Sequence, residues 1–208
     1  MSAPSDAPHR VDPDSQEKTW AEIGGSRIQV PLTIQENGEI NVPSKEVDYL
    51  KLVLISDTHC RMGEMIKQGL IPDGDVLIHA GDITSKGDEP SLRQFNEELG
   101  RLPHHHKVVI AGNHEFGFDP HEDQTQRWAE YQGVGTPEGY KLFTNCTFLN
   151  DSEVMIEGVK FYGSSWHALP QFPFYQPREA LKEKWAKVGA FTLTYGLTFS
   201  RSRRTSTF

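Results

Sequence analysis

Three short apolar runs in the first half of the chain are spaced about one helix apart. They cover Lys51–Ser56, Asp75–Ala80 and Lys107–Ala111, and each is typical of a strand. The bounded length of the first apolar run, Leu50–Ile55, suits a strand that is buried on both faces. Apolar positions at helical spacing follow the second run, from Glu89-Pro90 to the stop signal at Gly100. A second amphipathic helix is expected over Glu122–Tyr131. The alternation of strands and helices predicts an α/β fold with a parallel sheet.

The pattern changes after residue 139. Cys146–Leu149, Glu153–Ile156 and Lys160–Gly163 are short strand-like segments, and Glu157-Gly158 between the last two predicts a hairpin. A hairpin directly after the alternating units indicates an antiparallel sheet beside the parallel one. A further helix is expected over Arg178–Lys187.

The chain is expected to hold one main domain. Its 208 residues, 36% of them hydrophobic, suffice for one substantial core. Residues 1–18 are polar, charged and proline-containing and predict a disordered tail, whereas Trp20–Val30 is weakly strand-like. We place the domain at 19–187. Residues 188–208 form a divergent tail, in which Phe191–Phe199 alternates like an exposed strand.

The net charge of the chain restricts the kinds of molecule that it is expected to bind. The chain has 29 acidic and 21 basic residues, a net charge of −8, which argues against binding nucleic acid polymers or anionic membranes and favours a small soluble substrate. Met1–Ser15 has no apolar core of a signal peptide, and no apolar stretch reaches the roughly 20 residues of a spanning helix. We therefore expect a cytoplasmic protein, with Cys60 and Cys146 as isolated thiols.

Each of the three strands is followed by a polar motif. These are Asp57-Thr58-His59, Gly81-Asp82 and Gly112-Asn113-His114-Glu115. Ligands bind at the carboxyl ends of strands in open α/β sheets, so the three motifs are expected to meet at one edge. Carboxylate, imidazole and amide groups gathered there are suited to holding two divalent cations roughly 3.5–4 Å apart for attack on a phosphate ester.

Each residue then has a predicted role. Asp57 and His59 are two positions apart and can reach the same ion, and the carboxylate of Asp82 can bridge two ions through its two oxygens. Asn113 offers an amide oxygen to the second ion. His114, one residue on, can protonate a leaving group.

Taken alone, each motif is also compatible with a purely structural role. Asp-x-His is common, Gly-Asp is frequent in turns, and Asn113 could instead cap a helix; the conjunction of the three motifs favours the metal site. Three aromatic residues either stack on a base or cover the sheet: Phe172, Phe174 and Tyr175.

Further histidines are assigned to other roles. His79 lies inside a strand and is expected to be a hydrogen-bonded core histidine. His104–His106 are expected in a solvated loop, and His121 at the start of a surface helix. For His167, beside Trp166, lining of the cleft stays open as an alternative.

The longer motifs resemble those of the calcineurin-like metallophosphoesterase superfamily. Leu54–His59, Ile78–Asp82 and Val109–Glu115, with Asn150–Val154 and Phe161–Gly163 downstream, are similar to its branch of metallophosphoesterase-domain-containing proteins, relatives of class III cyclic-nucleotide phosphodiesterases. The resemblance implies a four-layer α/β/β/α sandwich. It also implies divalent ions, Mn²⁺ before Mg²⁺, Fe or Zn, and hydrolysis of phosphodiesters such as cyclic nucleotides.

The resemblance also implies a ligand set. Asp57, His59 and Asp82 would hold the first ion, Asp82 and Asn113 the second, and His114 would be the acid. Members of the branch continue after the position of Trp185 with Thr-His-Gly-Pro-Pro-like and Gly-His-x-His-like segments that complete both shells.

Residues 188–208 contain no His, Asp or Glu. The first ion would then lack one ligand and the second two, so we expect a sandwich that is incomplete at its C-terminus, an incomplete second site and weak or lost activity. The alternative is a non-catalytic binding or scaffold module on the same fold.

Overall fold

The computed structural model describes residues 33–34, 40–41, 50–188 and 197–201. The predicted tail at 1–18 and the weak strand pattern at Trp20–Val30 lie outside these residues. A short antiparallel pair, β1 (Thr33–Ile34) and β2 (Ile40–Asn41), precedes the main body.

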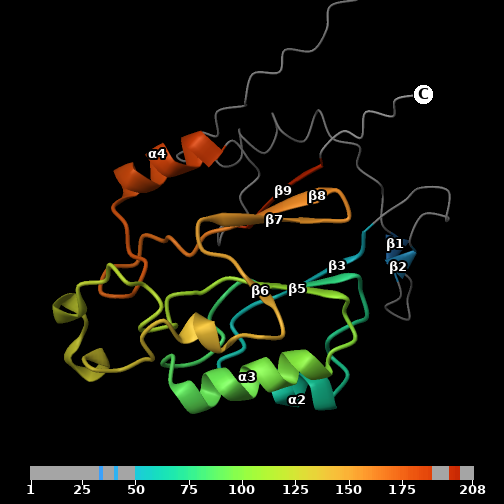
Figure 1. Ribbon diagram of the computed structural model, residues 1–208, viewed down its shortest axis with the longest axis horizontal. Helices are drawn as coiled ribbons and strands as arrows, with labels where there is room; N and C mark the ends of the chain where they lie inside the picture. Colours follow the sequence, from blue (N-terminus) through green and yellow to red (C-terminus); the bar gives the residue numbers. More distant parts are fainter. Residues whose placement is uncertain (1–32, 35–39, 42–49, 189–196, 202–208) are drawn as a thin grey trace, which may run out of the picture.

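The predicted parallel sheet is confirmed. Its strands pair in chain order and all run in the same direction: β3 (Leu52–Ile55), β4 (Val76–His79), β5 (His106–Val109) and β6 (Thr147–Phe148). The crossover helices are α2 (Met62–Lys67) and α3 (Glu89–Arg101). Because the strand order never reverses, right-handed crossovers place both helices on one face, as Figure 1 shows. The other face is left for a second layer.

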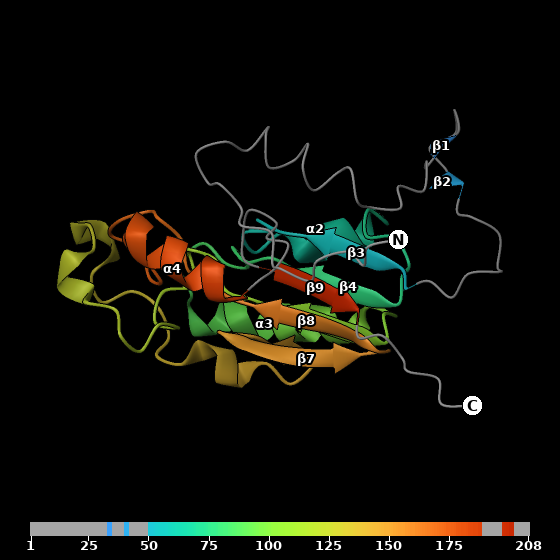
Figure 2. The same cartoon turned by 90° about the horizontal axis from the view of Figure 1, so that it is seen from above.

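An antiparallel sheet fills that second layer, as predicted. Its strands are β7 (Ser152–Ile156), β8 (Val159–Gly163) and β9 (Leu197–Arg201). The hairpin turn at Glu157-Gly158 has φ values of 48° and 75°, the left-handed conformation that two-residue hairpin turns require. Helix α4 (Arg178–Val188) lies outside this sheet, which gives the four layers α/β/β/α in Figure 1; Figure 2 shows β7, β8 and β9 side by side in the second sheet. Strand β9 lies within the segment 188–208.

Alternate residues of the parallel strands fill two separate cores. Val53, Leu77 and Val109 pack toward the helices, against Phe95 and Leu99 of α3. The intervening positions pack toward the second sheet: Val76, Ile78, Val108 and Ile110, against Leu149, Ile156 and Phe161. This period of two explains why the runs are almost wholly apolar, since both faces of the central strands are buried.

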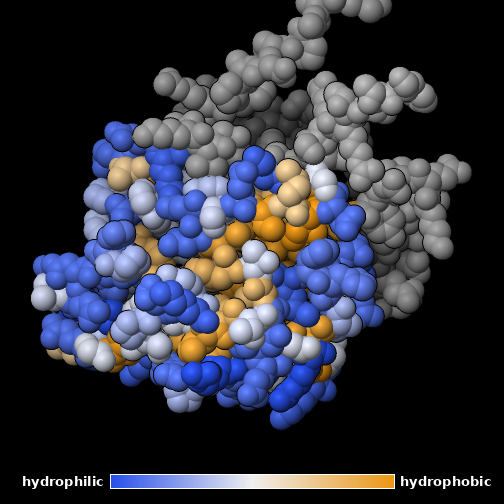
Figure 3. Space-filling view, viewed as in Figure 1, coloured by the Kyte–Doolittle hydropathy of each residue, from blue (hydrophilic) through white to orange (hydrophobic). Residues whose placement is uncertain are grey.

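The prediction of two-sided burial is wrong for one strand. Leu54 in β3 is 47% exposed, whereas all four residues of β4 are buried. Strand β3 is at the edge of the sheet and has a strand neighbour on one side only. Strands β6 and β7 are also at sheet edges, and Figure 3 shows hydrophobic side chains gathered on the side of the sandwich where these two strands lie.

The predicted helix over Glu122–Tyr131 is also wrong. The segment forms two short 3-10 helices, Gln124–Gln126 and Ala129–Tyr131. Arg127 between them turns inward, and its guanidinium forms a bidentate ion pair with Glu122 at 2.6 Å and donates to the carbonyls of Tyr131 and Val134. The arginine satisfies carbonyls that a continuous helix would use itself, so it stabilises a compact loop.

Two histidine predictions need correction. His104 is buried, and its Nε2 hydrogen-bonds the carbonyl of Pro72 at 3.0 Å, while His106 begins β5; only His105 is solvated as expected. His121 is exposed in a turn where its N–H donates to Asp119, and no helix starts there. The helix over Arg178–Lys187 is confirmed as α4.

The prediction for His79 is confirmed. Its side chain is fully buried on the helix side of β4, with the ring edge-on to Phe95 at 5.2 Å. Nδ1 accepts from the N–H of Gly81 at 3.3 Å, so Nε2 carries the proton and donates to Oγ1 of Thr58 at 2.9 Å. Burial lowers the pKa of His79 to about 3, with the charge of Asp57 opposing and that of His59 adding to this shift.

This low pKa predicts acid sensitivity. The folded state disfavours the imidazolium, whose pKa in the unfolded chain is the ordinary 6.5, so stability is lost as the pH falls from 6.5 toward 3. Between pH 7 and pH 5, His79 should lower the free energy of unfolding by about 2 kcal/mol. Urea denaturation of wild type and His79→Gln at both pH values measures this. An equal pH dependence in the two proteins would refute the assignment.

Candidate metal centre

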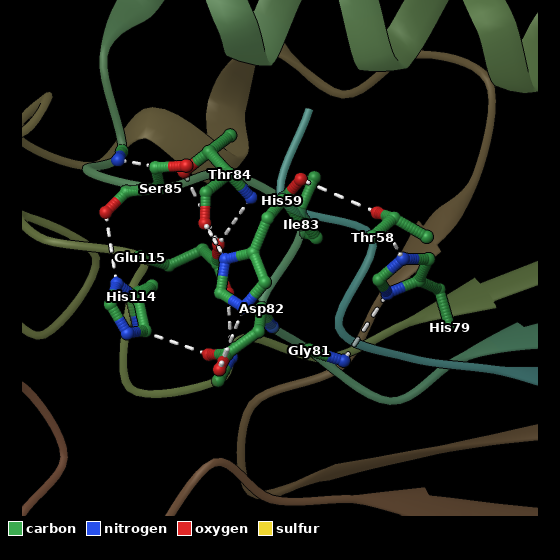
Figure 4. A network of polar contacts seen from close by, with 12 residues as sticks. Thr58, His59, His79, Gly81, Asp82, Ile83, Thr84, Ser85, His114 and Glu115 are labelled. Carbon is green, nitrogen blue, oxygen red and sulfur yellow. Dashed lines mark hydrogen bonds and ion pairs between the residues drawn. The ribbon is translucent and has the colours of Figure 1, made fainter. Parts of the chain in front are cut away.

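Three of the predicted ligands meet at the carboxyl end of the parallel sheet. One donor atom each from Asp57, His59 and Asp82 lies within 4.8 Å of the other two. Asp57 and His59 follow β3, and Asp82 follows β4; Figure 4 shows His59 lying over the carboxylate of Asp82. Nε2 of His59 is 3.8 Å from Oδ2 of Asp82, a separation that leaves room for a shared cation rather than a direct hydrogen bond.

All three of these residues have a left-handed backbone. The φ values are 55° at Asp57, 39° at His59 and 53° at Asp82, a region that side-chain-bearing residues rarely adopt. Backbone hydrogen bonds hold the two loops in this conformation: Asp57 N–H donates to Gly81 at 3.0 Å and His59 N–H to Asp82 at 3.1 Å. Strain of this kind is concentrated at functional sites, where the surrounding structure compensates for it.

Consecutive backbone carbonyls orient two histidines at the site. Nδ1 of His59 donates to the carbonyl of Thr84 at 3.1 Å, and Nδ1 of His114 to that of Ser85 at 2.9 Å. The two rings lie edge to face with centroids 4.9 Å apart. For His59, a proton on Nδ1 leaves the lone pair of the neutral imidazole on Nε2, which is the arrangement found in metal-binding histidines. Among the described residues, none hydrogen-bonds to Nε2 of His114.

The side chain of Glu115 hydrogen-bonds the loop after β4 and the loop after β5. This glutamate is fully buried and accepts from the N–H groups of Asp82 at 2.9 Å, Thr84 at 3.0 Å and Gly112 at 2.7 Å. Burial raises the pKa of Glu115 to about 7, while these hydrogen bonds oppose the shift. The sequence places Glu115 at the end of the third motif but assigns it no role. Its contacts identify it as the residue that positions Asp82.

Two motif glycines allow the loops to approach. Gly81 has a φ of 97°, and a Cβ on it would lie 2.6 Å from Cα of Gly112. A Cβ on Gly112 would in turn collide with Oδ1 of Asp82. The backbone of Gly112 therefore packs directly against the carboxylate of Asp82.

A side chain at position 112 should displace the carboxylate of Asp82. Gly112→Ala places a methyl group against the Asp82 carboxylate, so Mn²⁺ affinity should fall about tenfold or more, as for other losses of ligand support. Isothermal titration calorimetry measures the affinity, and circular dichroism verifies that the variant is folded. Unchanged affinity in a folded variant would show that the position of Asp82 does not depend on Gly112.

The third loop brings Asn113 and His114 to the same edge. The N–H of His114 donates to Oδ1 of Asp82 at 3.0 Å, and Gly112 contacts the same carboxylate. Asn113 stands between them with its side chain buried. The five predicted site residues therefore belong to three adjoining loops.

His167 does not add a free donor. Its Nε2 bonds the carbonyl of Pro173 at 2.8 Å, and its Nδ1 accepts from the N–H of Leu169 at 3.1 Å. Burial lowers the pKa of His167, while the bond to Pro173 and the charge of Asp82 raise it. Both ring nitrogens form hydrogen bonds within the loop after β8, so neither is free to bind a metal ion, while the charge of Asp82 acts on this ring.

The donor set fits a divalent cation. Two carboxylates and an imidazole combine hard oxygen with borderline nitrogen, a combination suited to Mn²⁺, Mg²⁺, Fe or Zn rather than to soft metals. The lone pair on Nε2 of His59 also supports metal binding, because Nδ1 of this ring is already hydrogen-bonded to the carbonyl of Thr84. The residues present therefore fit at least one metal ion.

Comparison with known proteins agrees with this geometry. Residues 50–198 match the calcineurin-like phosphoesterase family. The chain belongs to this family. It is 48% identical over 181 residues to a UPF0046 protein of Caenorhabditis elegans, covering 86% of this chain and 61% of that protein. It is 39% identical over 184 residues to human metallophosphoesterase domain-containing protein 1, covering 82% of this chain and 55% of that protein.

The family assignment confirms the expected fold. The family uses divalent metals, and Asp57, His59 and Asp82 form a candidate site for such an ion in this chain. The chain spans between one half and two thirds of the length of these relatives. In the part of the chain that the structure describes, no helix is long and apolar enough to cross a membrane.

Proposed function

We propose that this chain is a metal-dependent phosphodiester hydrolase that acts on small phosphoesters, cyclic nucleotides among them. The observation that carries the proposal is the convergence of Asp57, His59 and Asp82 at the carboxyl end of the sheet. Membership of the calcineurin-like phosphoesterase family supports the same reaction class. The net charge of −8 supports a small substrate rather than a nucleic acid polymer.

The residues have distinct roles in this proposal. Asp57, His59 and Asp82 would hold a first divalent ion, for which we propose Mn²⁺, and Asp82 and Asn113 would hold a second. Bound ions of this kind neutralise phosphate charge and lower the pKa of water. His114 donates a proton from Nε2 to the leaving oxygen, and the carbonyl of Ser85 accepts from Nδ1 and thereby holds the ring in orientation.

We further propose that activity in this form is weak. The described residues group three His, Asp or Glu donors at the site, and the sequence of 188–208 contains none of these residue types. A small set of protein ligands leaves more coordination positions to water, which lowers metal affinity. Hydrolysis of bis-p-nitrophenyl phosphate over a Mn²⁺ titration tests this. We expect slow turnover that rises with Mn²⁺ without early saturation. Turnover equal to that of human metallophosphoesterase domain-containing protein 1 would contradict the impairment.

The same donor count favours one alternative function, a non-catalytic binding module on this fold. Hydrolysis that stays at the protein-free rate at all Mn²⁺ concentrations, in a protein with a cooperative thermal transition, would favour this alternative.

Both cysteines in the described part are unpaired. Cys60 is exposed, and burial raises the pKa of Cys146 to about 12. Free thiols are typical of a reducing compartment, which supports the proposal that the protein acts in the cytoplasm.

A further inference from the structure

A cluster of aromatic rings stands beside the metal centre. Phe172, from the loop after β8, is half-buried, and its ring centroid lies 5.6 Å from that of His114 and 5.3 Å from that of Trp128. Phe116 and Tyr131 complete the cluster, at 5.9 and 6.0 Å from Phe172. The rings of His114, Phe172 and Trp128 therefore form a row that leads from the proposed acid, His114, outward along one side of the site.

The outer end of this row is open to solvent. Trp128 is 45% exposed, whereas Phe116 is fully buried. Trp128 thus packs one part of its indole against Phe172 and Tyr131 and presents the rest to solvent. The exposed face is available to a flat, apolar group of a ligand.

The loop that presents Trp128 is held rigidly. Arg127, next in sequence, is fully buried, pairs with Glu122 and lies 4.8 Å above the ring of Phe116. Phe172 is fixed from the other side, where the N–H of Phe174 donates to Asp119 at 3.0 Å. A preorganised aromatic surface loses little entropy when a ligand binds to it.

A positive charge borders the same surface. Nζ of Lys86 lies 6.0 Å from the ring centroid of Tyr131, and Lys86 follows directly on Ser85, whose carbonyl orients His114. Ligands with a planar ring and an anionic group match this combination of aromatic face and ammonium.

We propose that Trp128 and Phe172 bind the aromatic ring of the substrate's ester group, so that the enzyme prefers phosphoesters carrying a nucleobase over those with aliphatic groups. This inference rests on the proposed function, because it places the phosphate at the metal centre and the ring beyond His114. Stacking of one base on aromatic side chains should contribute about tenfold in affinity.

Binding of two probes at fixed Mn²⁺, measured by calorimetry, tests the inference without requiring turnover. AMP and ribose 5-phosphate share the phosphate and sugar, and only AMP carries the ring. Wild type should bind AMP about tenfold more tightly. Trp128→Ala should bring the ratio close to one and leave the affinity for ribose 5-phosphate unchanged, and Phe172→Leu should reduce the ratio.

Tyr175→Ala is the matched control. Tyr175 is 42% exposed on the same loop as Phe172 and has no ring contact with the described residues, so its removal should preserve the AMP preference. Equal affinities for the two probes in wild type, or a preference that survives both Trp128→Ala and Phe172→Leu, would overturn the inference and leave the proposed function standing. Binding of neither probe would overturn the proposed function and this inference with it.

Discussion

Asp82→Asn should reduce Mn²⁺-dependent hydrolysis of bis-p-nitrophenyl phosphate by roughly 100-fold or to the protein-free rate. The Asp82 carboxylate lies between the donors of the β3 loop and the loop that carries Asn113 and His114. Asparagine keeps the size of the side chain and one oxygen but removes the negative charge that Asp82 contributes to the candidate metal site. Initial rates of both proteins over the same Mn²⁺ titration measure the loss.

Asp73→Asn is the control for this substitution. Asp73 is an exposed aspartate before β4 and does not belong to the metal cluster, so its variant should retain wild-type rates. A rate for Asp82→Asn within a factor of two of wild type would exclude the bridging role.

Glu115→Ala should destabilise the fold by about 4 kcal/mol. The substitution leaves three buried N–H groups without an acceptor, those of Asp82, Thr84 and Gly112. Glu115→Gln retains one acceptor oxygen but turns an NH₂ group toward these donors, so about half of that loss is expected, together with weaker Mn²⁺ binding as Asp82 shifts. Chemical denaturation and calorimetry measure the two effects.

Glu97→Gln provides the comparison. Glu97 is on the exposed side of α3, where its contact with Arg101 is 3.9 Å long. The variant should change the free energy of unfolding by less than about 0.5 kcal/mol. A Glu115→Gln protein with wild-type stability and Mn²⁺ affinity would show that this carboxylate does not position the site.

Elements with local signals could be predicted from the sequence. The parallel strands are marked by apolar runs, and the hairpin by Glu157-Gly158 between two short strands. The helix prediction at Glu122–Tyr131 failed because the choice between helix and loop depends on the buried pair of Arg127 and Glu122. Such a pair is indistinguishable in sequence from two surface charges.

The part of the site that follows from strand topology could also be predicted from the sequence. Asp57, His59 and Asp82 follow strands whose carboxyl ends meet at one edge, so their convergence follows from topology. The carbonyls of Thr84 and Ser85 that orient the histidines belong to the backbone and leave no side-chain pattern. Glu115 did leave a signal, since an acidic residue within a motif between apolar segments has to be satisfied by partners.

Direct Mn²⁺ binding tests the central claim, that Asp57, His59 and Asp82 form a metal centre. Electron paramagnetic resonance of free Mn²⁺ during a titration should show saturable binding to the wild-type protein and to Asp73→Asn. Asp82→Asn should bind about tenfold more weakly or not at all. Equal binding by wild type and Asp82→Asn, or no saturable binding by wild type, would contradict the assignment of this site.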